Sequence, residues 1–206
     1  CCPRILHFFA KSTIFSSRFK NLFLDKLNLI PIYRKIDDEA NMGKNVDSFI
    51  KGYEILEKNG AFLIFPEGIS MGRRVLEKLK TGAARIGLEA EARNNFSLNC
   101  CIIPIGISYS DLVRFRSDIM VRFGEPIFFK DFQKESHSNE KQTVKILTGK
   151  IEDALNGLTN YLQNEEVEDI VDGLELIYKM ELMTEMGMEL EDRNDDFLTS
   201  KLLTCL

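Results

Sequence analysis

Histidine is scarce in this sequence: only His7 and His137 occur among 206 residues, which excludes a metal site built from three histidines. No run of 18 apolar residues is present, so no segment is predicted to span a membrane. The GxxxxG spacing at residues 82–87 is followed by Leu and Glu, where a triphosphate-binding loop needs Lys and Ser or Thr. We therefore expect no metal, no cofactor and no bound nucleoside triphosphate.

Five cysteines form two adjacent pairs and a singlet, with no CxxC motif. Adjacent cysteines seldom bridge each other, so the pattern indicates a reducing compartment. We expect Cys100 and Cys101 to pack as small apolar residues within a strand.

Charge is distributed unevenly along the chain, whose net charge is -5. Residues 164–196 hold 13 acidic and 2 basic residues, which suits either a solvated helix face or an interaction segment. Residues 1–35 hold seven basic residues against the single acid Asp25. This basic front suits an anionic partner, either a phosphate group or a membrane surface.

The composition, 44% hydrophobic and 29% charged, is that of a globular protein, and apolar runs alternate with segments of helical period. The predicted fold class is α/β, with a mostly parallel central sheet flanked by helices and a helical C-terminal extension. We expect an α/β domain over residues 1–130 and an acidic helical extension over 131–206. Strands are predicted over residues 5–10, 29–33, 61–65, 100–109 and 118–123, and helices over 13–28, 42–58, 81–93, 140–162 and 167–190.

Three of these predicted elements carry further expectations. The run 61–65 is wholly apolar and is predicted to be a central strand. Asp37 and Asp38 are expected to cap the helix over 42–58. The helix over 13–28 has an aromatic face beside basic residues, which fits either a core helix or a helix lying at a membrane surface.

Polar residues follow two of the predicted strands at their carboxyl ends, where ligands gather in parallel α/β sheets. Arg34 follows the strand over 29–33 and has the geometry to bind a phosphate with two hydrogen bonds. Glu67 and Gly68 follow the strand over 61–65, and Gly68 allows a ligand to approach the backbone closely. The alternative is structural, with Glu67 paired to Arg34 or to Lys80.

Three motifs in order resemble the second, third and fourth motifs of the PlsC-type glycerolipid acyltransferases. They are Leu-Ile-Pro-Ile-Tyr-Arg-Lys at 29–35, Ile-Phe-Pro-Glu-Gly at 64–68 and Ile-Ile-Pro-Ile-Gly-Ile at 102–107. Ala10-Lys11 and the segment 80–84 also resemble that family, so the likeness covers about residues 4–128.

The resemblance implies a reaction in which a fatty acyl group passes from a thioester to a glycerol hydroxyl. The implied co-substrate is acyl-CoA or acyl carrier protein, and the implied acceptor is glycerol-3-phosphate or the lysophospholipid 1-acylglycerol-3-phosphate. A membrane surface is an implied partner, nucleic acid is not, and the protein is expected to be membrane-associated with its active site on the cytoplasmic face. The alternative is a non-catalytic module of the same fold that binds anionic lipid or an acyl chain.

In that family an HxxxxD motif supplies the catalytic base, with the Asp orienting the His. Ser12 stands five residues after His7 and Gln142 five residues after His137, so neither histidine matches the motif. We expect His7 to be structural and His137 to lie solvated in a polar loop. The catalytic His and Asp are therefore expected upstream of Cys1, and the fragment by itself is expected to be inactive.

The resemblance also assigns roles to individual residues. Arg34 is expected to hold the acceptor's phosphate, while Lys11, Glu67 and Gly68 are expected at the acceptor pocket. The third motif departs from the family pattern, because Ile69-Ser70-Met71-Gly72 stands where Thr-Arg-Ser is usual. Arg73 or Arg74 is expected to replace the missing arginine, and Pro104 is expected either to pack in the core or to line the acyl pocket. The expected supporting residues are Pro66, Ser70, Arg73, Arg74, Lys80 and Pro104.

Overall fold

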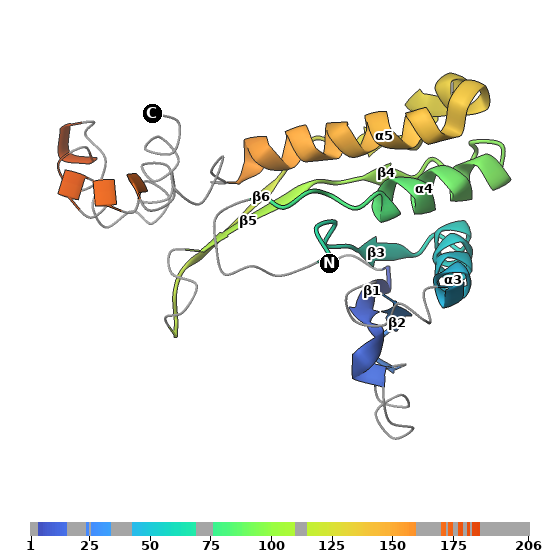
Figure 1. Cartoon of the computed structure of the whole chain (residues 1–206), viewed down its shortest axis with the longest axis horizontal. Coiled ribbons are helices and arrows are strands. Elements are labelled where there is room, and N and C mark those ends of the chain that lie inside the picture. The colour runs from blue at the N-terminus through green and yellow to red at the C-terminus, as the bar shows by residue number, and fades with distance from the viewer. Residues whose placement is uncertain are drawn as a thin grey trace. The chain divides into compact units, whose positions relative to one another are not determined.

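The structure, a computed structural model, describes residues 4–15, 24, 26–33, 43–68, 76–109 and 115–159, and ten more between 170 and 185 (Figure 1). It is a mixed α/β fold with a parallel three-stranded sheet, helices packed on that sheet and a long C-terminal helix. The described residues between 170 and 185 are helical, as the sequence predicts. Among the described residues, no helix is both long enough and apolar enough to cross a membrane.

The parallel sheet consists of β1 (Leu6–Lys11), β2 (Leu29–Ile32) and β3 (Ala61–Leu63), in the order β2-β1-β3. All three lie where strands are predicted, and the pairing places Phe8 of β1 opposite both Leu29 and Leu63. The prediction that 61–65 is the central strand is wrong, because β1 occupies the centre of this sheet. The all-apolar run indicates burial, but it does not encode the position of a strand in its sheet.

Two helices come next in the chain after sheet strands, α3 (Asn45–Glu57) after β2 and α4 (Gly82–Arg93) after β3. Gly52 of α3 lies so near the sheet and α4 that an added Cβ would be 3.2 Å from Ile86 Cγ2. The two helices also pair basic groups with rings, because Arg85 lies over Phe49 at 5.5 Å and Arg93 over Tyr53 at 5.2 Å. These contacts fix α3 against α4 and against the sheet.

Helix α3 does not begin where the sequence predicts. Lys44 occupies its N-cap position and makes no capping side-chain hydrogen bond, and the predicted caps Asp37 and Asp38 lie outside the described residues. The C-terminal boundary is as predicted, since Asn59 adopts a φ of 60° and the Gly60 N–H donates to the Ile55 carbonyl at 2.8 Å. This left-handed residue ends the helix in the usual way.

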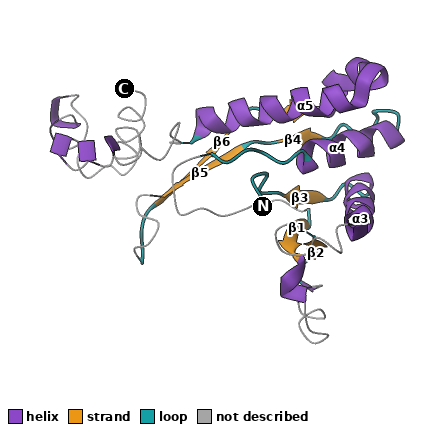
Figure 2. Ribbon diagram, viewed as in Figure 1, coloured by secondary structure: helices purple, strands orange, loops and turns teal. Residues whose placement is uncertain are grey.

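The predicted strand over 100–109 is two strands, β4 (Cys101–Ile102) and β5 (Ile105–Tyr109). Pro104, which has no N–H to donate, stands in the break between them. Strand β4 pairs with β7 (Ile127–Phe128), whereas β5 pairs antiparallel with β6 (Ile119–Phe123). Figure 2 shows β5 and β6 together as a two-stranded ribbon.

The short helix η3 (Phe129–Phe132) leads into α5 (Gln133–Leu158), which starts earlier than the predicted helix over 140–162. Asn139 has non-helical angles within α5, and its Oδ1 accepts the Gln142 N–H at 3.1 Å. This is an N-cap interaction, so the predicted start near 140 corresponds to a real capped turn. The helical residues before Asn139 are not predicted from the sequence. His137 is one of them, so it lies in a helix rather than in the predicted loop, and its side chain is exposed.

The chain divides into two compact units. The first contains residues 1–66, 80–102 and 128–148, and the second contains residues 67–79, 103–127 and 149–206. The sheet and the helix pair α3 and α4 belong to the first unit, and the β5–β6 ribbon belongs to the second. The predicted boundary near residue 130 stays a prediction. Most of the predicted helix over 13–28 lies outside the described residues. Its first residues, up to Phe15, belong to the short helix η1 (Ser12–Phe15).

Candidate acceptor site

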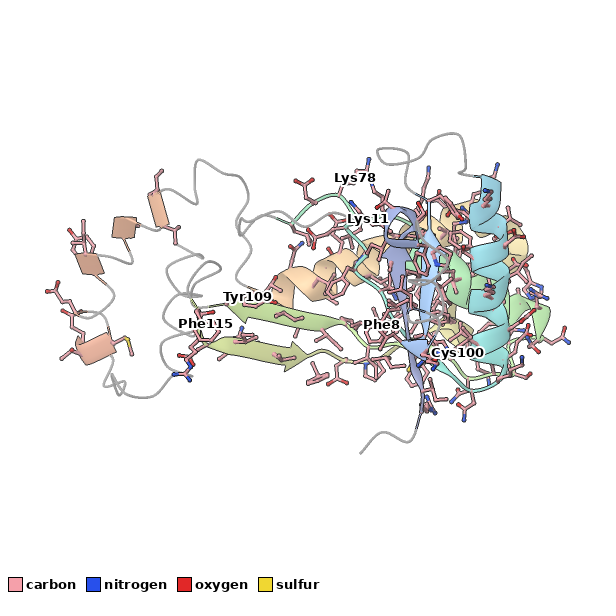
Figure 3. The ribbon with its side chains drawn as sticks, turned by 90° about the horizontal axis from the view of Figure 1, so that it is seen from below. Phe8, Lys11, Lys78, Cys100, Tyr109 and Phe115 are labelled. Atoms are coloured by element: carbon pink, nitrogen blue, oxygen red, sulfur yellow. The ribbon has the colours of Figure 1, made fainter. Side chains whose placement is uncertain are left out.

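Lys11 lies at the carboxyl end of β1, where its side chain is exposed (Figure 3). The register places it opposite Ile32, the last residue of β2. Because the three strands are parallel, the residues that follow them emerge at the same edge of the sheet. Tyr33 follows β2 at this edge, and Pro66 closes the segment that follows β3. The strand of the second motif thus lies where it is predicted, with Lys11 at the same edge of the sheet, and the binding role of Lys11 stays a prediction.

Asn45, at the start of α3, holds the backbone of Tyr33 at both of its polar groups. Its Oδ1 accepts the Tyr33 N–H at 2.8 Å, and its Nδ2 donates to the Tyr33 carbonyl at 2.7 Å. A side-chain amide here replaces the neighbouring strand that would otherwise satisfy these groups. The residue immediately before Arg34 is therefore fixed in position.

Ser48, one turn further along α3, strengthens the same attachment. Its buried hydroxyl donates to the Pro31 carbonyl at 2.6 Å. The Lys44 ammonium lies over the Tyr33 ring, 5.7 Å from its centroid. Sequence reasoning missed Asn45 and Ser48, because a polar pair at the first turn of a helix is the ordinary pattern of a cap.

The segment after β3 has two internal attachments. In the first unit, the Lys80 N–H donates to the Pro66 carbonyl at 2.7 Å, which joins the two ends of the segment. In the second unit, the Glu67 carboxylate accepts the Glu77 N–H at 3.2 Å through Oε2. Glu67 therefore has a backbone N–H as one structural partner. Arg34, one of the two side chains considered above as its partner, lies outside the described residues, so that pairing stays a prediction.

Gly68 adopts a φ of 71°, a conformation that is strained for residues with a Cβ. The glycine of the third motif is thus required by the backbone of this turn, independently of any ligand. Gly68 also opens a GxSxG spacing at residues 68–72, which is typical of serine hydrolases. That motif needs a strand leading directly into a helix, and the next helix after β3 in the described part of the chain starts at Gly82.

Two predicted supporting residues have clear surroundings. The Lys80 side chain is exposed, and its residue directly precedes Thr81, the N-cap of α4. Pro104 is buried, and its carbonyl accepts the Gly124 N–H at 2.9 Å. This places Pro104 in the packing of the second unit, one of the two roles expected for it. Four predicted residues lie outside the described residues: Arg34, Ser70, Arg73 and Arg74.

The two histidines have different surroundings. The His7 ring lies 5.7 Å from that of Phe62, and its buried Nδ1 has no hydrogen-bond partner among the described residues. The His137 ring lies 5.8 Å from that of Phe96, beside an open cavity of about 270 Å³ between α4 and α5. In the described part of the chain, no group of three His, Cys, Asp or Glu residues is arranged to hold a metal ion.

The adjacent cysteines also differ. Cys101 is exposed in β4, contrary to the prediction that both cysteines pack as apolar residues. Burial, with the nearby carboxylate of Glu91 as the next cause, raises the pKa of the Cys100 thiol to about 11. Glu91 is fully buried and accepts the Cys100 N–H at 2.5 Å. Cys100 is therefore a protonated, packed thiol at neutral pH rather than a nucleophile.

Residues 1–108, more than half of the chain, match the acyltransferase family. The chain therefore belongs to this family, whose motifs contribute the residues described above.

Among its relatives are two proteins of Saccharomyces cerevisiae. Glycerol-3-phosphate O-acyltransferase 1 is 30% identical over 141 residues, which cover 67% of this chain. Glycerol-3-phosphate O-acyltransferase 2 is 27% identical over 136 residues, or 66% of the chain. An uncharacterised acyltransferase of Schizosaccharomyces pombe is 27% identical over 126 residues, or 60% of the chain. The chain spans 18% of the length of each of these relatives. No solved structure matches it.

Proposed function

We propose that this chain forms the acceptor-binding part of a glycerolipid acyltransferase. The reaction transfers a fatty acyl group from acyl-CoA or acyl carrier protein to the hydroxyl of glycerol-3-phosphate or 1-acylglycerol-3-phosphate. The observation that carries the proposal is the order of the three motifs in a member of the acyltransferase family. The second motif contains strand β2 and the third directly follows β3, and both strands pair in parallel with β1. The names of the two yeast relatives support glycerol-3-phosphate as the acceptor.

In this reaction the acceptor's hydroxyl oxygen attacks the thioester carbonyl, a C–O bond forms and the C–S bond breaks. The hydroxyl proton passes to a histidine base and then to the departing thiolate, which leaves as a thiol. The base belongs to an HxxxxD motif that we expect upstream of Cys1. Arg34 binds the acceptor's phosphate through charge-assisted hydrogen bonds, and Lys11 adds positive charge at the same edge of the sheet.

The third motif, in the loop after β3, is assigned to acceptor binding by the family resemblance alone. Gly68 removes the bulk of a side chain where the backbone turns, so a bound glycerol can approach the chain closely. Glu67 keeps the loop in shape by accepting the Glu77 N–H. The protein is proposed to work at the cytoplasmic face of a membrane, where its lipid acceptors and products reside.

A non-catalytic module that binds anionic lipid or an acyl chain is the second candidate function. It is favoured by one observation, that neither His7 nor His137 has an Asp five residues later. The two candidates differ in turnover: both bind the phosphate-bearing acceptor, but only the enzyme consumes the acyl thioester.

The upstream coding sequence provides the first test. The enzyme proposal expects an HxxxxD motif within about one strand and one helix before Cys1, since these elements precede the corresponding strand in the family. The protein encoded by the complete gene is then incubated with radiolabelled acyl-CoA and glycerol-3-phosphate. Labelled 1-acylglycerol-3-phosphate is the expected product. A complete protein that binds glycerol-3-phosphate but releases no thiol from acyl-CoA or acyl carrier protein is the binding module instead.

A further inference from the structure

The β5–β6 ribbon has two faces of different chemistry. Its antiparallel register pairs Ile105 with Phe123, Ile107 with Val121 and Tyr109 with Ile119. Because side chains alternate along a strand, these three pairs share one face, which we call the outer face. All six side chains of the outer face are apolar or aromatic.

The inner face of the ribbon carries the residues in between, including Gly106 and Ser108. It is covered by the end of α5, since a Cβ added to Gly106 would lie 2.5 Å from the Leu158 carbonyl oxygen. Leu158 also approaches Gly124, just after β6, where an added Cβ would be 2.8 Å from its Cδ1. The ribbon therefore buries its inner face within the second unit.

The outer face is open instead. Phe123 is 69% exposed, Ile119 56%, Val121 48% and Tyr109 44%. A single exposed apolar residue is ordinary, but a contiguous apolar sheet face of this kind marks a surface that binds something.

The end of the ribbon where β5 finishes extends this surface. Figure 3 shows Tyr109 and Phe115 at this same end, and Phe115 is 87% exposed. The Arg116 guanidinium lies over the Phe115 ring, 5.7 Å from its centroid, and its side chain is exposed. An exposed ring beside an exposed guanidinium suits a boundary between an apolar and an anionic layer, because each group then reaches its preferred surroundings.

The charge of the chain limits where an anionic surface could bind. Residues 105–123 hold three arginines and two aspartates, but Arg122 pairs with Gly106 and so belongs to the inner face. An anionic surface would repel the chain as a whole, and the acidic stretch over 164–196 most of all. Attraction to such a surface must therefore be local, and the outer face combines exposed apolar area with the exposed guanidinium of Arg116 at its end.

We propose that the outer face of the β5–β6 ribbon, with Phe115 and Arg116 at its end, binds the surface of an anionic lipid bilayer. The apolar side chains enter the boundary between headgroups and acyl chains, and Arg116 binds lipid phosphates. The choice of a lipid partner rests in part on the proposed function, whose acceptors and products are lipids. The apolar face and its charge are observed independently of that function.

Vesicle sedimentation tests the proposal with the full chain, using phosphatidylcholine vesicles with and without phosphatidylglycerol. The chain is expected to bind the vesicles that contain phosphatidylglycerol. The double variant Phe115→Ser/Phe123→Ser should lower the vesicle partition coefficient by about tenfold or more, since two exposed rings lose their apolar contact with the bilayer. Arg116→Ser should weaken binding to the anionic vesicles only, and added salt should weaken the wild type but not this variant as strongly.

The matched control is Val46→Ser/Ile146→Ser, which removes two exposed apolar side chains from α3 and α5 (62% and 42% exposed). This control should bind vesicles like the wild type, and circular dichroism should show that both double variants fold. Equal binding by wild type and Phe115→Ser/Phe123→Ser overturns the proposal.

A second copy of the chain is the main competing occupant. If the wild type fails to bind vesicles but forms a dimer in sedimentation velocity, and Phe115→Ser/Phe123→Ser makes it a monomer, the outer face is a dimer interface and the lipid assignment is wrong. Absence of both vesicle binding and dimers also overturns it. None of these measurements uses catalysis, so a complete protein that binds vesicles without transferring acyl groups contradicts only the proposed function.

Discussion

The parallel sheet β2-β1-β3 and the antiparallel β5–β6 ribbon place their functional groups differently. In the sheet, polar and basic residues follow the strands at one edge, and α3 supports that edge through Asn45 and Ser48. In the ribbon, a face rather than an edge is distinctive, with apolar side chains outside and α5 against the inside. Strand ends are suited to holding a small polar ligand, whereas an open apolar face is suited to a broad surface.

The largest expected effect tests the edge of the sheet. Arg34→Ala should raise the apparent KM for glycerol-3-phosphate by roughly 10- to 150-fold in the complete protein, because a charge-assisted hydrogen bond contributes about 1.5 to 3 kcal/mol. Glycerol, which lacks the phosphate, should be used equally by the variant and the wild type.

Arg85→Ala is the matched control for that measurement, since its guanidinium lies over the Phe49 ring in the α3–α4 packing. It should leave the KM for glycerol-3-phosphate unchanged. An unchanged KM in Arg34→Ala would mean that the acceptor's phosphate does not bind at this edge of the sheet. The proposed difference in function between the sheet edge and the ribbon face would then be wrong.

The next effect tests the inner face of the ribbon. Gly106→Ala should lower the free energy of unfolding by about 2 kcal/mol, because its Cβ would overlap the Leu158 carbonyl, which belongs to a helix backbone and yields little. Urea unfolding followed by circular dichroism measures this loss. Gly149→Ala in α5 is the control: nothing lies within 4 Å of its added Cβ, so it should raise stability by about 0.5 to 1 kcal/mol. Equal behaviour of the two variants would mean that the inner face is not packed on α5.

A smaller effect tests how α3 supports the edge of the sheet. Asn45→Ala should lower the free energy of unfolding by about 1 to 2 kcal/mol through the loss of two hydrogen bonds to Tyr33. It should also raise the apparent KM for glycerol-3-phosphate several-fold, because the residue before Arg34 is no longer fixed. Asn45→Asp keeps only the acceptor and should fall between alanine and the wild type in both measurements.

Asn94→Ala is the control for Asn45→Ala. Asn94 also makes two side-chain hydrogen bonds at a helix end, to Glu57 at 3.1 Å and to the Ala90 carbonyl at 2.9 Å. It should lose comparable stability without a change in KM. If both variants raise KM equally, Asn45 acts through general stability rather than by positioning the second motif.

The helices and strands differ in how far the sequence could predict them. Strands β1 and β2 and helix α4 were predictable because short apolar runs and helical periods are local patterns. The order β2-β1-β3 was not, since partners are chosen by tertiary packing. The break between β4 and β5 had a local signal in the sequence, namely Pro104. The predicted helix start near residue 140 also had one, the capping side chain of Asn139. The turns before Asn139 had no such signal, because residues 133–138 are mostly polar.

Site residues follow the same division. Lys11, Glu67 and Gly68 are predicted as site residues because they come after apolar runs and match the family motifs, and their binding roles stay predictions. Asn45 could not be found in this way, since its partner Tyr33 lies 12 residues earlier and their hydrogen bonds exist only after α3 packs on β2. The motif order indicates what the edge of the sheet binds, while the supporting residues are visible only in the folded chain.

The smallest expected effect separates the backbone role of Gly68 from its role toward a ligand. Gly68→Ala should lower the free energy of unfolding by about 1 kcal/mol, because a residue with a Cβ is strained at a φ of 71°. Gly68→Asn should recover about half of this loss, since asparagine tolerates the left-handed region better than alanine. Urea unfolding measures the two losses, and acyl transfer in the complete protein measures the KM for the acceptor.

If asparagine restores stability while KM stays high, a bound glycerol needs the space that glycine leaves. If KM recovers together with stability, the third motif's glycine serves the turn alone.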